Sequence, residues 1–118
     1  MNPTRKSKIE SEIIRLLAKL IVSGKVKDPR IGIVSLHRAN LSNDMGHVKI
    51  WFTSYCSEKE KRNLITGMNS ARGYFQSVLG KELGLRLTPK ITFEWDEEFI
   101  KSLAVNQLID KLSEEEKN

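Results

Sequence analysis

The sequence predicts a single α+β domain in which a three-stranded sheet carries helices on one of its faces. Apolar residues recur at helical spacing in two long segments, residues 5–23 and 57–83. Three short segments, residues 31–41, 47–55 and 91–95, have the composition or the alternation of strands. Three strands are too few for a barrel, and helices and strands are too mixed for a helical bundle. The 118 residues correspond to one domain.

The first helix is predicted over residues 5–23. Its apolar residues follow one another at steps of three and four along one face. They are Ile9, Ile13, Leu16, Leu17, Leu20 and Ile21. The opposite face is mostly basic, with Lys8, Glu12, Arg15 and Lys19. Gly24 stands where a left-handed residue ends a helix, and Pro29 follows soon after.

A β-hairpin is predicted next. Residues 31–41 are rich in Ile and Val and end at the turn-forming residues Ser42-Asn43-Asp44. Residues 47–55 alternate apolar and polar side chains with a period of two, which indicates a half-buried strand. The short connection makes these strands a hairpin. Because its second face carries Trp51, we expect that face to be partly covered.

A second helical segment begins at Ser57, which forms a capping box with Glu60 three residues later. Its apolar stripe continues to about residue 83, but Gly67 and Gly73 interrupt it. Each interior glycine costs a helix about 1 kcal/mol relative to alanine. A kink at residues 70–73 would explain both glycines, and we expect one there.

The chain ends with a third strand and a short helix. Gly84 ends the second helical segment, and residues 91–95 alternate as a strand that a right-handed crossover returns to the sheet. Apolar residues between 99 and 112 predict a short terminal helix that begins at the acidic run Asp96-Glu97-Glu98. We therefore expect one domain over residues 1–112 and an acidic, disordered tail over residues 113–118.

The charge favours a polyanionic partner. Twenty Lys and Arg against 15 Asp and Glu give a net charge of +5 and a pI near 9.4. Eight cations and three anions give residues 1–30 a charge of +5, and seven cations and three anions give residues 58–90 a charge of +4. Residues 91–118 carry eight anions and three cations, for −5. Surplus lysine also serves solubility alone, so the charge leaves a binding role open.

Several function classes fit poorly. No apolar run approaches the roughly 20 residues that cross a bilayer, and a lone cysteine with no leader-like start favours a reducing, cytoplasmic setting. His37, His47 and Cys56 do not have the spacing of a zinc site, and their roles stay open. No Gly-rich loop followed by Lys is present. We expect no catalytic residues, no metal and no cofactor.

Four segments, in order along the chain, resemble ribosome-binding factor A. They are residues 5–9, Asp28-Pro29-Arg30-Ile31-Gly32, Ser42-Asn43-Asp44-Met45 and Asn69-Ser70-Ala71-Arg72-Gly73-Tyr74. The resemblance covers residues 5–112. It implies a type II KH-like fold, in which the Gly-Xaa-Xaa-Gly turn of ordinary KH domains is replaced by an Ala-Xaa-Gly kink, here residues 71–73.

The resemblance also implies a function. Such a protein is a non-enzymatic bacterial assembly factor that binds the immature small ribosomal subunit and its ribosomal RNA and supports rRNA processing and maturation. Implied further partners are other assembly factors or a GTPase that releases it. We expect a monomer without membrane contact. Near the end, Ser102 and Ala104 replace a glycine and an arginine usual in the family, so we expect the contribution of the C-terminal segment to differ here.

The expected RNA contacts combine the basic segments with the kink. They are Arg5, Lys8, Arg15, Lys19, Lys25, Lys27, Arg30, Ser70, Ala71, Arg72, Gly73, Lys81 and Arg86. Each has a structural alternative: the charges can be solvated helix faces, and Gly73 can serve helix packing or bending only. Two other functions stay open, a general KH-like RNA-binding protein and a protein-interaction adaptor with incidental basic charge.

Overall fold

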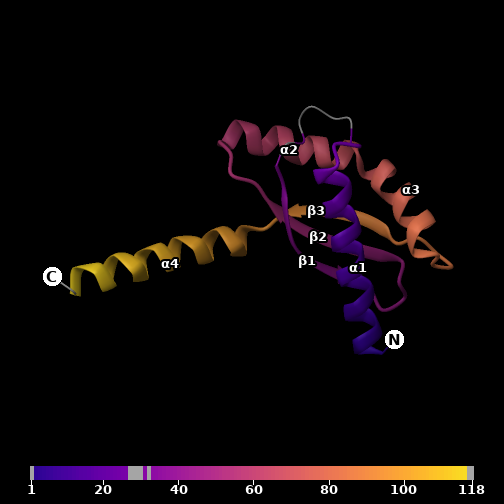
Figure 1. The fold of residues 1–118 in the computed structure, drawn as a ribbon, viewed down its shortest axis with the longest axis horizontal. Coiled ribbons are helices and arrows are strands. Elements are labelled where there is room, and N and C mark those ends of the chain that lie inside the picture. Colours follow the sequence, from indigo (N-terminus) through magenta and orange to yellow (C-terminus); the bar gives the residue numbers. More distant parts are fainter. Residues whose placement is uncertain (1, 27–30, 32, 117–118) are drawn as a thin grey trace.

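The computed structural model describes residues 2–26, 31 and 33–116. Within these residues the chain forms four helices and three strands, which Figure 1 labels in chain order. They are α1 (Pro3–Val22), β1 (Ser35–Leu41), β2 (His47–Thr53), α2 (Glu58–Ser70), α3 (Arg72–Leu83), β3 (Lys90–Trp95) and α4 (Glu97–Glu116). This is the α-β-β-α-kink-α-β order of the type II KH-like fold, so the predicted fold class is confirmed.

The sheet has the order β1-β2-β3. β1 and β2 form the predicted antiparallel hairpin, with an irregularity between Leu36 and Arg38, and β3 pairs parallel to β2. The first strand begins at Ser35, four residues later than expected. Its first partner is Thr53, where β2 ends, so the residues before Ser35 have no β2 residue opposite them.

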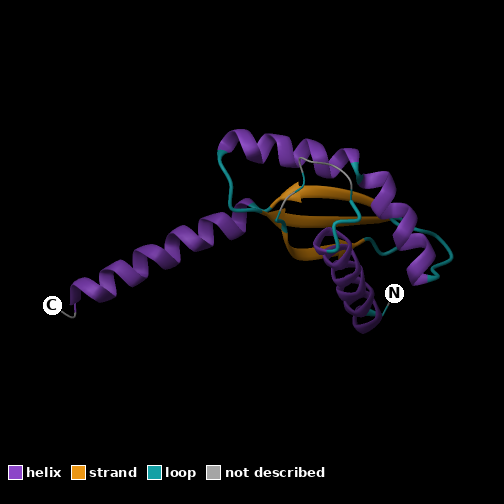
Figure 2. Cartoon of the chain, turned by 45° about the horizontal axis from the view of Figure 1, so that its top comes forward, coloured by secondary structure: helices purple, strands orange, loops and turns teal. Residues whose placement is uncertain are grey.

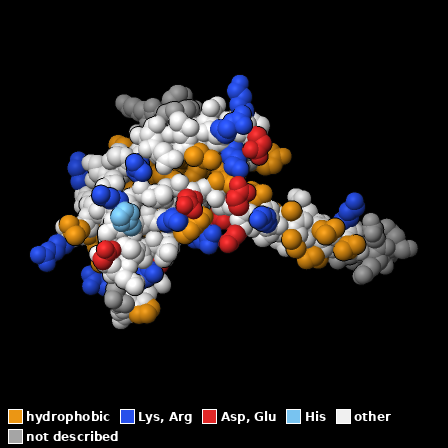
Figure 3. Space-filling view, turned by 180° about the vertical axis from the view of Figure 1, so that it is seen from behind, with side chains coloured by type: hydrophobic (Ala, Val, Ile, Leu, Met, Phe, Trp, Pro, Cys, Tyr) orange, Lys and Arg blue, Asp and Glu red, His pale blue; other side chains and the backbone are white. Residues whose placement is uncertain are grey.

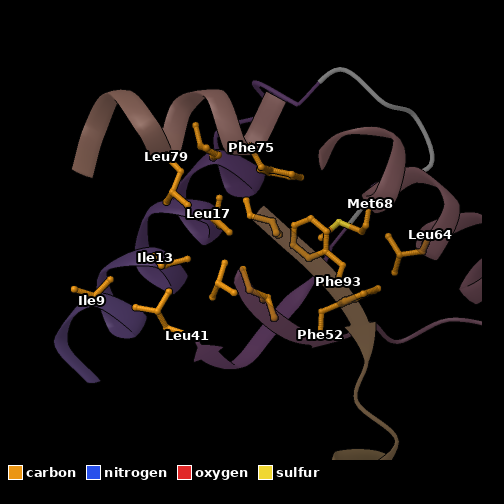
Figure 4. Packing of buried hydrophobic residues seen from close by; sticks show 14 residues of the cluster. Ile9, Ile13, Leu17, Leu41, Phe52, Leu64, Met68, Phe75, Leu79 and Phe93 are labelled. Atoms are coloured by element: carbon orange, nitrogen blue, oxygen red, sulfur yellow. The ribbon is translucent and has the colours of Figure 1, made fainter. Parts of the chain in front are cut away.

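The core lies between α1, α2 and α3 and one face of the sheet (Figures 2 and 4). The apolar stripe of α1 enters it through Ile9, Ile13, Leu17 and Leu20, which are buried as predicted. The sheet contributes Phe52 and Phe93, whose rings pack edge to face at 6.2 Å. Alternation along β2 and β3 directs every second side chain into this core.

The helix ends follow the local sequence. Ser57 caps α2 by accepting a hydrogen bond from the Glu60 amide at 3.2 Å. In a full capping box the Glu60 side chain would accept from the Ser57 amide. Here the Glu60 carboxylate accepts from the Ser57 hydroxyl instead, at 2.9 Å. Gly24 and Gly84 have positive φ angles of 72° and 59°, as expected of residues that end helices.

The terminal helix differs from the prediction in its length. α4 runs for 20 residues, without an interior Gly or Pro, and projects away from the domain in Figure 1. Asp96 caps it, since its Oδ1 accepts from the Phe99 amide at 3.1 Å. Residues 113–116, for which we expected disorder, have helical backbone, and residues 117–118 lie outside the described residues.

Side chains of α2 and β1 hold the start of α4 against the domain. Lys61 Nζ lies 3.1 Å from Glu97 Oε1, and the Phe99 ring stacks on His37 with centroids 3.9 Å apart. Arg38 NH2 lies 3.5 Å from the buried Asp96 carboxylate. These contacts fix where α4 leaves the domain, while the rest of the helix extends beyond it.

Candidate nucleic-acid interface

The predicted kink is a single residue between two helices. α2 ends at Ser70 and α3 begins at Arg72, so that Ala71 serves as the C-cap of one and the N-cap of the other. The Ala71 amide donates to the Gly67 carbonyl, and its carbonyl accepts from the Phe75 amide. No side chain caps α3, so no side chain of the described domain occupies the start of this helix.

Gly73 is exposed at the start of α3. A Cβ added there would meet nothing within 4 Å, and its φ is not positive. Neither packing nor backbone conformation in the folded domain therefore requires glycine at this position. The observation weakens the packing alternative and leaves close backbone approach by a ligand as a reason for Gly73.

A hollow of about 330 Å³ lies beside the start of α3. Arg72 from α3, His47 from β2 and Lys90 from β3 all line it. The parallel register places His47 opposite Lys90, and each of these residues begins its strand. Two cationic side chains and an imidazole thus meet next to an uncapped helix start, an arrangement suited to a phosphate group.

The hollowed surface continues along α3. A second hollow of about 400 Å³ is lined by Gly73, Gln76, Ser77, Gly80 and Thr88. Gln76 lines both hollows, so together they form one concave flank of α3. Small and uncharged side chains line the second part, which leaves room for a polymer backbone to approach the helix closely.

The basic face of α1 forms a second candidate surface. Arg5, Lys8, Arg15 and Lys19 are exposed and follow one another along the helix at steps of three, seven and four residues. None of these four lines either hollow. The structure therefore confirms that they share an exposed helix face, which is distinct from the lining of the two hollows.

The remaining expected contacts are more dispersed. Ser70, Lys25, Lys81 and Arg86 are exposed, whereas Ala71 is half-buried and packs against the core. Lys27 and Arg30 lie outside the described residues. The two hollows include only Arg72 and Gly73 from the predicted set.

Sequence reasoning missed Lys90 and left the role of His47 open. The two residues are far apart in the chain, and only the parallel pairing of β2 with β3 brings them together. The sequence contained a signal, because His47 begins one predicted strand (residues 47–55) and Lys90 directly precedes another (residues 91–95). The packing of α3 against β3 then brings Arg72 beside these two residues, and no local pattern encodes this adjacency.

Two aromatic rings suitable for base stacking, those of Tyr55 and Tyr74, are exposed among the described residues. The Arg38 guanidinium covers the Trp51 ring at 4.1 Å, in agreement with the expectation that this face of the hairpin is partly covered. Tyr74 follows Gly73 and is 41% exposed. The geometry favours recognition of the RNA backbone, with Tyr74 as the one described ring beside the kink.

The histidines and the cysteine do not converge. Within the described ranges, no three His, Cys, Asp or Glu side chains are grouped as metal ligands would be. His37 Nε2 lies 2.6 Å from the Thr53 hydroxyl, which gives this ring a structural contact. Partial burial, with Glu60 and Glu58 nearby, raises the pKa of the Cys56 thiol, so the thiol is not activated as a nucleophile.

Helices in the described part of the chain are too short or too polar to span a bilayer.

Comparisons with known proteins agree with this geometry. Residues 5–109 match the sequence model of the family described as Ribosome-binding factor A. A protein of that name from Leptospira biflexa is 48% identical over 110 residues, which are 93% of this chain and 74% of that protein. A solution NMR structure from Thermotoga maritima, of a candidate ribosome binding factor A, has a TM-score of 0.68 and 31% identity, covering 80% of this chain and 90% of that one. A third match is a homology model of the Thermus thermophilus ribosome binding factor A, fitted into a cryo-EM map of a 30S complex of that protein. It has a TM-score of 0.61 and 20% identity, and the match covers 75% of this chain and 92% of that one.

Proposed function

The chain belongs to the ribosome-binding factor A family, and on this premise we propose that it binds the immature small ribosomal subunit through ribosomal RNA and promotes rRNA processing and maturation. It acts without catalysis of its own. The family membership supports the ribosomal target, and the 30S complex of the Thermus thermophilus relative supports the small subunit. Such a role places the protein in the cytoplasm with assembling subunits.

The observation that carries the proposal is the basic hollow at the start of α3. Arg72, Lys90 and His47 surround a space beside amides that no side chain caps. Arg and Lys donate charge-assisted hydrogen bonds to phosphate oxygens, and the helix N-terminus adds favourable electrostatic potential. A phosphate of the RNA backbone fits this chemistry, and Gly73 lets the chain of nucleotides pass close to α3.

The basic face of α1 supplies a second contact. Arg5, Lys8, Arg15 and Lys19 are spaced along one exposed face, and cations of this kind contact phosphates without reading sequence. Two separated phosphate-binding surfaces on a rigid domain recognise the relative placement of RNA segments. We therefore propose recognition of RNA shape, with modest base specificity.

Binding of this kind favours one conformation of the precursor RNA. A protein that binds one conformation more tightly than another shifts the population towards it, by as much as the difference in binding free energy. Maturation then requires departure of the protein. An affinity that depends on phosphate contacts is sensitive to salt and can be overcome by another assembly factor or by a GTPase.

Sucrose-gradient co-sedimentation tests the proposal. Purified protein is mixed with small or large subunits from a strain lacking the factor, at several salt concentrations. We expect binding to small subunits, enriched on immature particles, that falls steeply as salt rises. Equal binding to large subunits and unrelated RNA would instead indicate a general RNA-binding protein, and binding that is insensitive to salt would indicate a protein-interaction adaptor.

A further inference from the structure

The distal half of α4 carries an apolar face that the described domain does not cover. Val105, Leu108, Ile109 and Leu112 are between 51% and 58% exposed. Their separations of three and four residues place them on one side of the helix. Figure 3 shows hydrophobic side chains grouped along this projecting helix. A face of this kind is typical of a helix that docks into an apolar groove.

The start of α4 is held while this apolar face is presented. Glu97 pairs with Lys61, and Phe99 stacks on His37, so the first turn is attached to α2 and the sheet. Asp96 caps the same turn through the Phe99 amide. The exposed half therefore leaves the domain in a defined direction, and a partner at that place meets a helix that is already oriented.

The charge of α4 determines which partner fits. Residues 97–116 include six acidic and two basic residues, a net charge of −4. RNA is a polyanion, so this helix is repelled by the ligand that the basic hollow attracts. A complementary surface is a protein with an apolar groove and a basic rim.

A second copy of the chain fits less well. Burying an aliphatic side chain fully removes roughly 100 Å² of apolar surface from water. Four half-exposed side chains from each of two copies would bury roughly 400 Å², against the roughly 1,200 Å² at the low end of stable interfaces. The face is thus too small to hold two free molecules together. It is sufficient as a second contact for a protein that is already bound elsewhere, because the effective concentration is then high.

We propose that the distal half of α4 docks into an apolar, basic-rimmed groove of a protein component of the small subunit while the basic hollow contacts RNA. This inference rests on the proposed function. Val105, Leu108, Ile109 and Leu112 enter the groove, and the net negative charge of the α4 sequence complements its basic rim. The domain is thereby bound by two contacts of opposite chemistry, one to RNA and one to protein.

Site-specific photocrosslinking tests this docking. The full chain carries p-benzoylphenylalanine in place of Leu108, or in place of the exposed Gln107 as the matched control on the same helix. Each variant is irradiated in complex with purified small subunits. We expect a crosslink from position 108 to a subunit protein, at least fivefold stronger than from position 107. A crosslink to rRNA or to a second copy, equal yields from both positions, or no crosslink from bound protein would overturn the inference.

Binding of charge variants gives an independent readout. The double variant Leu108→Glu, Ile109→Glu should bind small subunits about three- to tenfold more weakly than wild type, whereas Gln107→Glu should bind like wild type. All three residues are exposed, so none of the substitutions disturbs the core. Wild-type affinity of the double variant would overturn the docking and leave the proposed function standing. Failure of the wild type to bind subunits would refute the proposed function and, with it, this inference.

Discussion

A Cβ on Gly80 would lie 2.6 Å from the Thr88 hydroxyl oxygen. The loop that follows α3 thus packs directly on the backbone of this glycine, whereas the space around Gly73 on the same helix is open. Gly80 is required by packing and Gly73 is not. Gly80 therefore has a structural role, and Gly73 remains available for the binding role proposed for it.

This contrast predicts opposite effects of two alanine substitutions. Both gain the helix propensity of alanine, but Gly80→Ala also forces Thr88 away, so it should be less stable than Gly73→Ala by about 1–3 kcal/mol. Gly73→Ala should be as stable as wild type or more stable, and should bind small subunits less tightly. Thermal unfolding and co-sedimentation measure the two properties. A destabilised Gly73→Ala variant would restore the packing explanation for this glycine.

The packing of α1 can be tested at Leu17, which is fully buried in the core that α1 shares with α3 and the sheet. Leu17→Ala should lower the free energy of unfolding by about 2–5 kcal/mol, because it leaves a cavity in a packed core. Val22 is 86% exposed at the end of the same helix, so Val22→Ala should change stability by at most about 0.5 kcal/mol. Urea unfolding compares the variants, and equal stability of the two would show that α1 does not pack as described.

The β1–β2 turn should give stability a small dependence on acidic pH. The Ser42 hydroxyl donates to Asp44 Oδ1 at 2.7 Å and the Gly46 amide donates to it at 2.9 Å, and these bonds hold the pKa of Asp44 below its usual 3.8. The stabilisation is complete above the unfolded-state pKa and is lost as pH falls through the lower folded-state pKa.

The stability advantage of wild type over Asp44→Ala should therefore be constant above about pH 5 and shrink as the pH falls below 3.8. Urea unfolding at a series of pH values from neutral to strongly acidic measures it. An advantage that stays constant, or grows, at acidic pH would contradict the role of the ionised carboxylate.

Asp96 should control the order of the first turn of α4. Asp96→Ala removes the hydrogen-bond acceptor for the Phe99 amide, which costs a helix about 0.5–2 kcal/mol, and leaves Arg38 without a buried partner. Asp96→Asn keeps a good cap and is the matched control. Amide hydrogen exchange over residues 99–103 should be faster in the alanine variant and close to wild type in the asparagine variant. Equal exchange in both variants would show that another contact orders this turn.

Local patterns were sufficient for much of the fold. The stripe of α1, the Ser57 cap and the break at Ala71 depend on neighbours within a few residues, and the structure confirms each. Features that depend on distant partners were not predictable in the same way. The start of β1 is set by where β2 ends, and the irregularity near Arg38 arises in the pairing of the strands.

The candidate site shows the same difference between local features, which were predicted, and features that depend on distant partners. Arg72 and Gly73 were predicted because the kink is a local motif that also resembles a known family. Lys90 was missed, because its place beside Arg72 results from parallel pairing and from the packing of α3 on the sheet. The length of α4 was underestimated because fading apolar periodicity predicts fraying, whereas helical backbone continues through Glu116.

Charge reversal in the basic hollow tests the central claim most directly. Co-sedimentation with immature small subunits compares wild type, Arg72→Glu, Lys90→Glu and Lys59→Glu. Lys59 is an exposed cation on α2 that lines neither hollow, so its reversal changes the net charge equally without touching the site. A lost charge-assisted hydrogen bond of about 1.5–3 kcal/mol predicts binding weaker by about tenfold or more for Arg72→Glu and Lys90→Glu, with Lys59→Glu close to wild type. Equal binding by all four proteins, with each variant folded, would contradict the claim that this hollow binds ribosomal RNA.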